Sequence, residues 1–250
     1  MKAKLKNFLE EWRCKQMTKG WHLRGKRRIY HYHIRKTGGS SLNYMFLALA
    51  GEDPEKAYAR LAKKENHRLV TGKRVYVGWN VSLIEGGNFF YAFSHTPAHK
   101  MSLPKNTFTL TCFRDPVRRV ISLYNMLRFY RENDIAHPCM RVQGKWLGKN
   151  FGTFIRKVPQ NHLSRQLFMF SKNFNVEEAL ENIEKVDYFF FTENFENGVA
   201  ELNRRLQLPL TPLHIKKAKT AYEILDSEKN ELRELLSQEY EMIERLKAST

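Results

Sequence analysis

Residues 29–41, Ile-Tyr-His-Tyr-His-Ile-Arg-Lys-Thr-Gly-Gly-Ser-Ser, decide how this chain folds. Large apolar residues alternate up to Ile34, as in a β-strand. After the turn, the apolar residues recur at the i, i+3, i+4, i+7 spacing of a helix: Leu42, Met45, Phe46 and Leu49. Between the two periodic segments, Gly38 and Gly39 allow a tight turn and a close backbone approach to a ligand. The stretch predicts a strand, a glycine turn and a helix.

The turn also carries groups that bind anions. Lys36 supplies a positive charge, and hydroxyl groups come from Thr37, Ser40 and Ser41. The free N–H groups at the start of the helix can converge on a phosphate. The lysine precedes the glycines, so the order differs from the G-x-x-x-x-G-K-[ST] loop of ATP- and GTP-binding proteins. The same glycines also fit an ordinary strand-to-helix turn, and the motif by itself leaves both interpretations open.

A second segment with the same organisation begins at Phe108. The apolar run 108–113 predicts a strand, and Asp115 followed by Pro116 is typical of the start of a helix. Arg114 then stands at the end of the strand, and Ser122 lies two helical turns further on. A guanidinium and a hydroxyl in this arrangement suit a second phosphate. Taken alone, the segment also fits a solvated basic helix face.

The two motifs together resemble the PAPS-dependent sulfotransferases, in particular the carbohydrate (Golgi-type, sulfotransferase family 2-like) branch and its bacterial relatives. Residues 33–42 are similar to that family's 5′-phosphosulfate loop, and residues 112–124 are similar to its 3′-phosphate motif. Weaker similarity extends the match to about residues 29–208. The resemblance implies a P-loop-like α/β domain and 3′-phosphoadenosine 5′-phosphosulfate (PAPS) as donor, with 3′-phosphoadenosine 5′-phosphate (PAP) as product.

The resemblance also implies roles for individual residues. Lys36 would neutralise the leaving oxygen, and Arg114 with Ser122 would hold the 3′-phosphate. The turn would hold the 5′-phosphate through Thr37, Gly38, Gly39, Ser40 and Ser41. The reaction is expected to be an in-line displacement, with no metal, because a sulfuryl group carries less charge than a phosphoryl group. Lys216 or Lys219, in a late basic segment, would touch the 3′-phosphate, although such a short charge run is also typical of a solvated surface.

The acceptor hydroxyl needs a base, and the best-placed candidate is His95. It follows the apolar run 89–93, and catalytic groups in open α/β sheets collect at the carboxyl ends of strands. Its imidazole suits general-base catalysis near neutral pH. A loop histidine that only bonds backbone is the alternative, and His99 is the second candidate. His31 and His33, which alternate with aromatics, are expected to be packed and hydrogen-bonded.

Strands and helices alternate along the chain, which predicts a single α/β domain with a central, mainly parallel sheet flanked by helices. The predicted boundaries are a basic N-terminal helical segment over 1–28 and a sulfotransferase domain over 29–250. Strands are predicted at 29–34, 74–78, 89–94, 107–113 and 187–192. Helices are predicted at 40–50, 116–131, 151–157, 160–170, 177–184, 195–207 and 227–246.

The net charge of +17, from 43 Lys and Arg against 26 Asp and Glu, indicates an anionic partner. A doubly phosphorylated donor with an anionic saccharide or glycoconjugate acceptor accounts for this charge, and no nucleic-acid motif appears. The basic residues of 1–28, with Leu9 and Trp12 on one stripe, fit either a helix docked on the domain or peripheral contact with an anionic membrane. No apolar leader or membrane span follows, so we expect a bacterial, cytoplasmic enzyme, with a trimmed luminal domain as the alternative.

These observations predict a sulfotransferase that moves a sulfuryl group from PAPS to a hydroxyl of a carbohydrate, with a histidine base. Two alternatives come from other classes of protein. A nucleotide or small-molecule kinase with a variant phosphate loop would need a metal-binding acid and an intact P-loop. A basic nucleic-acid-binding module would use the turn only as an anion contact.

Overall fold

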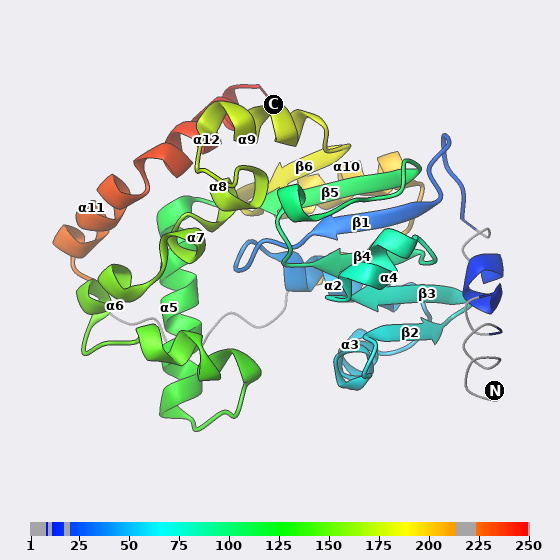
Figure 1. Cartoon of the computed structure of the whole chain (residues 1–250), viewed down its shortest axis with the longest axis horizontal. Helices are drawn as coiled ribbons and strands as arrows, with labels where there is room; N and C mark the ends of the chain where they lie inside the picture. The colour runs from blue at the N-terminus through cyan, green and yellow to red at the C-terminus, as the bar shows by residue number, and fades with distance from the viewer. Residues whose placement is uncertain (1–8, 10–11, 18–20, 214–223, 250) are drawn as a thin grey trace. The chain divides into compact units, whose positions relative to one another are not determined.

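A computed structural model describes residues 9, 12–17, 21–213 and 224–249 (Figure 1). The chain forms two compact units. The described residues of unit 1 fall within Met1–His33, Gly38–Cys112 and Lys185–Leu213, and those of unit 2 within Ile34–Thr37, Phe113–Glu184 and His214–Thr250. The boundary between the two units therefore falls within the glycine turn, between Thr37 and Gly38.

Unit 1 is built on a six-stranded sheet with the strand order β2-β3-β4-β1-β5-β6. The central strand β1 pairs in parallel with β4 and β5, so Tyr32 lies beside Ser94 on one side and Thr111 on the other. β3 is parallel to β4, and β2 is antiparallel to β3. The segments after β1, β4 and β5 therefore leave the same edge of the sheet. The bounds are β1 Arg28–Tyr32, β2 Arg68–Thr71, β3 Arg74–Gly78, β4 Tyr91–Ser94, β5 Thr107–Phe113 and β6 Tyr188–Phe191.

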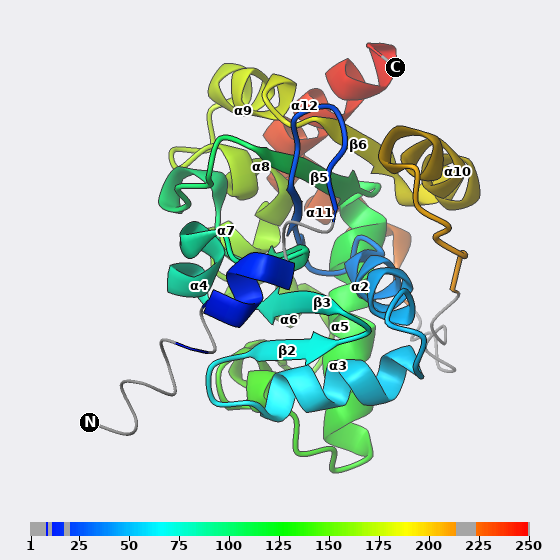
Figure 2. The same cartoon turned by 90° about the vertical axis from the view of Figure 1, so that its right-hand side faces the viewer.

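Helices cover both faces of this sheet. Figure 2 shows α2 (Gly39–Ala48) and α10 (Phe195–Leu206) on one side and α4 (Val81–Gly86) on the other. α3 (Pro54–Lys63) shares one apolar core with α2, α10 and the sheet. Within this core the ring of Phe46 stacks on Tyr91, with 3.9 Å between their centroids. The helical spacing read from the sequence is thus the buried face of α2.

Unit 2 is mainly helical. Asp115 caps α5 by accepting the Arg118 N–H at 2.8 Å, and Pro116 is the first helical residue, as predicted. Apolar residues of α5, α6 and α11 form one core. The bounds are α5 Pro116–Glu132, α6 Phe151–Lys157, α7 Gln160–Leu163, α8 Arg165–Phe170, α9 Val176–Glu184, α11 Asp226–Leu235 and α12 Ser237–Ala248.

The predicted α/β class, with a mainly parallel sheet flanked by helices, is confirmed. Two predicted helices are each broken in two, at Ser164 (φ −94°, ψ 53°) and at Leu236 (φ −106°, ψ 13°). Among the described strands and α-helices, three were not predicted: β2, α3 and α4. α3 begins with an Asp53-Pro54 cap of the same kind as Asp115-Pro116, so its start was readable from the sequence.

The N-terminal segment contributes helical residues at 12–17, where Cys14 is buried and Trp12 is 57% exposed. The boundary at residue 28 stays a prediction. Lys216 and Lys219 lie outside the described residues. No helix in the described ranges combines the length and the apolar character needed to cross a bilayer.

A buried ion pair organises unit 2. Glu239 and Arg119 both have no exposed surface, and the Arg119 Nε lies 3.6 Å from a Glu239 carboxylate oxygen. The carboxylate also accepts the backbone N–H groups of Gln166 at 2.9 Å and Leu167 at 3.1 Å. These N–H groups belong to the first turn of α8, where a helix has no internal acceptors for them. Glu239 therefore caps one helix from another while neutralising Arg119.

The same carboxylate holds the side chain of Gln166, which in turn fixes Arg114. Gln166 Nε2 donates to Glu239 at 3.0 Å and to the Arg114 carbonyl at 2.9 Å. Gln166 Oε1 accepts the Arg114 N–H at 2.8 Å. Tyr240, the next residue of α12, donates its hydroxyl to Asp115 at 3.0 Å. The backbone at the start of the second motif is thus clamped by side chains from α8 and α12.

Replacing Glu239 by Gln keeps the shape but leaves the buried Arg119 charge without a counter-ion. We expect Glu239→Gln to lower the free energy of unfolding by about 3 to 5 kcal/mol, the cost of breaking a buried ion pair. The melting temperature should fall by roughly 10 °C for a chain of this size. The control is Glu241→Gln, since Glu241 is an exposed residue of the same helix, 3.7 Å from Arg245. Equal melting temperatures for the two variants would contradict this role of Glu239.

Candidate functional site

The glycine turn begins α2 with backbone geometry that only glycine adopts easily. Gly38 has φ +80° and is the N-cap of α2, and no side chain among the described residues caps the helix. The N–H groups of the first turn are therefore left for another acceptor. A Cβ at Gly38 would also lie 3.1 Å from atoms of Phe195 and Thr192.

Gly39 is required for a different reason, because it lies directly on a histidine ring. A Cβ at this position would come within 2.1 Å of His33 Cδ2 and 2.5 Å of His33 Nε2. No side chain fits there unless His33 moves. Gly39 thus allows the start of α2 to lie directly against His33, the last residue of unit 1 before the loop.

His31 and His33 are buried and hydrogen-bonded, as the sequence predicted. Asn43 Oδ1 accepts from the Tyr91 hydroxyl at 2.8 Å and from His31 Nδ1 at 3.1 Å, so Asn43 Nδ2 donates to His33 Nδ1 at 3.3 Å. His33 Nδ1 is therefore an acceptor, and its proton is on Nε2. Burial lowers the pKa of His31 to about 4, which keeps that ring neutral at physiological pH.

His95 is held in a defined tautomer by the backbone of the first strand. Its Nδ1 lies 2.6 Å from the His33 carbonyl oxygen, and the two imidazole centroids are 4.5 Å apart. Because a carbonyl only accepts, Nδ1 carries the proton, and in the neutral ring Nε2 carries the lone pair. The preceding residue, Ser94, is fixed by a 2.7 Å hydrogen bond to the Tyr30 hydroxyl. His99 lies in a short 3₁₀ helix four residues later.

In unit 2, the loop brings Lys36 to Arg114. Arg114 Nη1 donates to the Lys36 carbonyl at 3.2 Å, joining residues 78 positions apart in the sequence. Lys36 has φ +70°, a conformation rare for a residue with a side chain. The Thr37 hydroxyl donates to the Ile34 carbonyl at 3.0 Å and closes this turn. The two residues predicted to serve opposite ends of the donor therefore meet in one unit.

Burial and neighbouring positive charges lower the pKa of two cations in this unit, Lys36 and Arg165. Burial, followed by the charges of Arg114 and Arg35, lowers the pKa of Lys36 to about 8. Burial and the charges of Arg119 and Arg35 lower the pKa of Arg165 to about 10. In the same unit, the carboxylate of Glu239 is engaged by Arg119. An excess of positive charge at partly buried positions is what an anion-binding site requires.

Ser122 lies on α5, two helical turns beyond Arg114, as predicted. Asn125 follows one turn later on the same face of the helix, and its Oδ1 is buried with no hydrogen-bond partner among the described residues. Its unsatisfied oxygen adds a second polar group to this face.

Several residues that shape the two groups were not recognised from the sequence: Arg35, Asn43, Arg165, Gln166 and Glu239. A signal existed for Glu239, because it falls on the apolar stripe of the last helices, between Leu236 and Ile243. A charged residue on such a stripe indicates a buried partner. No comparable signal marks Asn43, since polar residues are common on a helix.

Within the described ranges, no three His, Cys, Asp or Glu side chains are arranged to hold a metal ion. A search of curated proteins finds no significant match to this chain. The sequence profile of the sulfotransferase family, in contrast, matches residues 22–242, which include both motifs and parts of both units. This match covers most of the chain and confirms the family that the two motifs suggested. The chain therefore belongs to the sulfotransferase family and is a sulfotransferase enzyme.

Proposed function

We propose that the sulfuryl donor is PAPS and that the acceptor is a carbohydrate hydroxyl activated by His95. The observation that carries this proposal is the meeting of Lys36 and Arg114 in unit 2, with the hydrogen bond from Arg114 to the Lys36 carbonyl. A donor with phosphates at both ends needs two cationic groups held at a fixed spacing. Gln166 holds the backbone of one and the loop turn holds the other.

The donor residues divide by charge and by type of contact. Lys36 and the N–H groups of the first turn of α2 serve the 5′-phosphosulfate, with hydroxyls from Ser40 and Ser41. Arg114 and Ser122 serve the 3′-phosphate, because a guanidinium binds two oxygens of one phosphate at once. Thr37 supports the turn through its bond to Ile34.

In the proposed transfer, one bond to sulfur forms as another bond to sulfur breaks. The acceptor oxygen forms a bond to sulfur while the bond between sulfur and the bridging oxygen of the 5′-phosphate breaks. The proton of the acceptor hydroxyl moves to His95 Nε2, and the charge on the departing oxygen is stabilised by Lys36 in its ammonium form. The His33 carbonyl, which accepts from His95 Nδ1, stabilises the imidazolium that forms.

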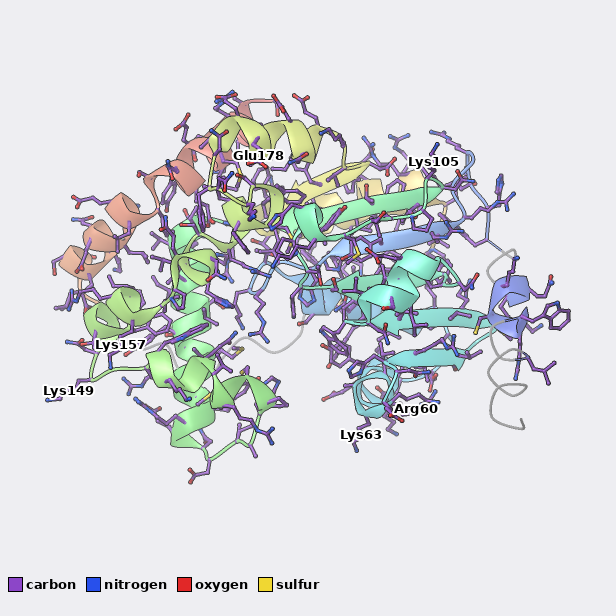
Figure 3. All side chains as sticks on the ribbon, in the orientation of Figure 1. Arg60, Lys63, Lys105, Lys149, Lys157 and Glu178 are labelled. Carbon is purple, nitrogen blue, oxygen red and sulfur yellow. The ribbon has the colours of Figure 1, made fainter. Side chains whose placement is uncertain are left out.

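The carbohydrate acceptor is supported by the net charge and by the absence of a nucleic-acid pattern. Exposed lysines are spread over separate segments of the chain, as Lys63, Lys105, Lys149 and Lys157 illustrate in Figure 3. A nucleic-acid-binding module concentrates such residues in one stripe or groove. Scattered basic charge instead attracts anionic substrates in general, including acidic glycans.

The donor is tested by titrating PAP, AMP, ATP and a DNA oligomer into the protein by calorimetry. We expect PAP to bind at micromolar concentrations and AMP, which lacks the 3′-phosphate, to bind far more weakly. Arg114→Ala should weaken PAP binding by about 2 to 4 kcal/mol, because a buried phosphate charge loses its partner. Arg118→Ala removes an exposed arginine from the next turn and is the control. Tight binding of ATP, or binding of DNA without a preference for PAP, would refute PAPS as the donor.

The lowered pKa of Lys36 predicts how PAP binding depends on pH. An anion favours the ammonium form, so binding takes up a proton when the free amine is neutral. Above about pH 8 the affinity for PAP should therefore fall, by up to about tenfold per pH unit. Lys36→Arg keeps a charge at every pH and should remove this dependence. Calorimetry between about pH 7.5 and 9.5 measures it, and an unchanged affinity of the unmodified enzyme would contradict the assignment.

The base is tested by separating binding from turnover. His95→Ala should leave the affinity for PAP within about twofold and lower the transfer of labelled sulfate to a saccharide panel by roughly 100-fold or more. His95→Asn retains an N–H that can reach the His33 carbonyl and should be equally inactive, because it has no basic nitrogen. His99→Ala is the matched control. If His99→Ala loses transfer while His95→Ala keeps it, His95 is not the base.

A further inference from the structure

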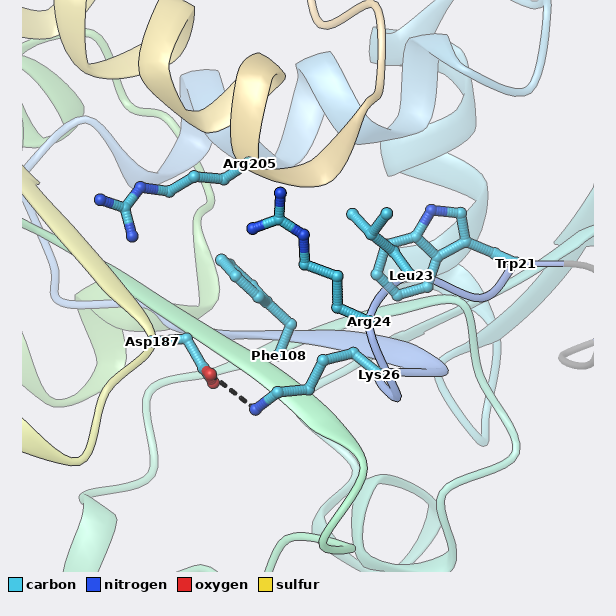
Figure 4. A pocket seen from close by; sticks show the side chains of 7 residues that line it. All are labelled: Trp21, Leu23, Arg24, Lys26, Phe108, Asp187 and Arg205. Carbon is cyan, nitrogen blue, oxygen red and sulfur yellow. Dashed lines mark ion pairs between the residues drawn. The ribbon is translucent and has the colours of Figure 1, made fainter.

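Unit 1 contains a pocket of about 220 Å³ near the amino ends of β1 and β5. Figure 4 shows its seven lining residues: Trp21, Leu23, Arg24, Lys26, Phe108, Asp187 and Arg205. The predicted donor and base residues follow the opposite, carboxyl ends of the strands. The pocket is therefore separate from the residues assigned to the transfer reaction.

A strained turn holds one arginine over this pocket. Leu23 and Lys26 pair through hydrogen bonds of 3.0 and 2.9 Å, and the two residues between them both have positive φ, 49° at Arg24 and 83° at Gly25. Such turns favour Asn-Gly or Gly-Gly, because a long side chain is disfavoured in the left-handed conformation. Arg24 occupies this position nonetheless, and its side chain extends past the Phe108 ring toward α10, which carries Arg205 (Figure 4).

Positive charge around the pocket exceeds negative charge. Lys26 is paired with Asp187 at 2.6 Å. Glu201 is shared between Arg204 and Arg205, each at 2.7 Å, so one carboxylate serves two guanidinium groups. Arg24 forms no ion pair with any residue that the structure describes. Arg24 and Arg205 therefore retain capacity for an external anion.

The remaining lining is aromatic and apolar. The Trp21 ring packs edge-on against Phe90, with centroids 5.9 Å apart, which fixes its orientation. Phe108 is 9% exposed. A ring with an apolar C–H face and one anionic group could thus place that face on these rings and its charge between the arginines.

We propose that this pocket binds an anionic saccharide unit, with its carboxylate or sulfate ester on Arg24 and Arg205 and its ring against Trp21 and Phe108. The proposal rests on the carbohydrate acceptor proposed above and extends it. The pocket holds a part of the acceptor other than the hydroxyl that receives the sulfuryl group. Longer acidic acceptors are then bound better than short ones, because two separate contacts act on one chain.

The test measures binding of glucose 6-sulfate, glucuronate, glucose and inorganic sulfate to the full chain by ligand-observed NMR. Glucose 6-sulfate and glucuronate should bind at millimolar concentrations, and glucose and inorganic sulfate at least about fivefold more weakly. Arg24→Ala should weaken glucose 6-sulfate about tenfold, because a charge-assisted hydrogen bond is lost. Its control, Arg27→Ala, removes an exposed arginine of the same segment that does not line the pocket.

A second matched pair protects the test against effects on folding. Arg205→Ala should weaken the same ligand, whereas Arg204→Ala should not, although both arginines share Glu201. Equal losses of affinity for glucose 6-sulfate in Arg24→Ala and Arg27→Ala would refute the site. The site would also be refuted if inorganic sulfate bound as tightly as the anionic sugars, or if a DNA oligomer displaced them. PAP affinity is measured alongside. Binding of the anionic saccharides without binding of PAP would refute PAPS as the donor but not the saccharide site. Binding of PAP without binding of the saccharides would refute only the saccharide site.

Discussion

A carboxylate without contact with water must be neutralised. The contacts that neutralise Glu239 also position the helices and the Arg114 backbone of unit 2. Glu239 pairs with Arg119, accepts the first N–H groups of α8 and holds the amide of Gln166, which clamps both backbone groups of Arg114. The arrangement divides the arginines by function. Arg119 is neutralised inside the protein, whereas burial and the charges of Arg114 and Arg35 lower the pKa of Lys36.

In unit 1, His33 connects two features that have different chemistry. Its ring fills the space in front of Gly39, and its carbonyl fixes the tautomer of His95. Asn43 determines the protonation of the same ring from α2. The same residue therefore contacts the glycine turn with its ring and orients the proposed base with its carbonyl. Because the His33 ring occupies the space in front of Gly39, only glycine fits at position 39.

Local signals in the sequence were sufficient for the strand, the glycine turn, the capped helix α5 and the general α/β class. They were insufficient where the structure of a residue depends on a partner that is distant in the sequence. Glu239 lies on the apolar stripe between Leu236 and Ile243, and its role depends on Gln166, 73 positions away. The breaks at Ser164 and Leu236 fall inside stretches with continuous helical periodicity. Leu235 is 47% exposed because α11 ends there, within the single helix predicted at 227–246.

The environment of Lys36 has a chemical consequence beyond ligand binding. An amine whose pKa is about 8 is largely a neutral nucleophile in mildly alkaline solution, whereas an ordinary lysine remains an ammonium ion. Acylating or aldehyde reagents that carry a phosphate are thus directed to this side chain, both by its reactivity and by the neighbouring positive charge. The loop offers a natural attachment point for covalent probes of the donor site.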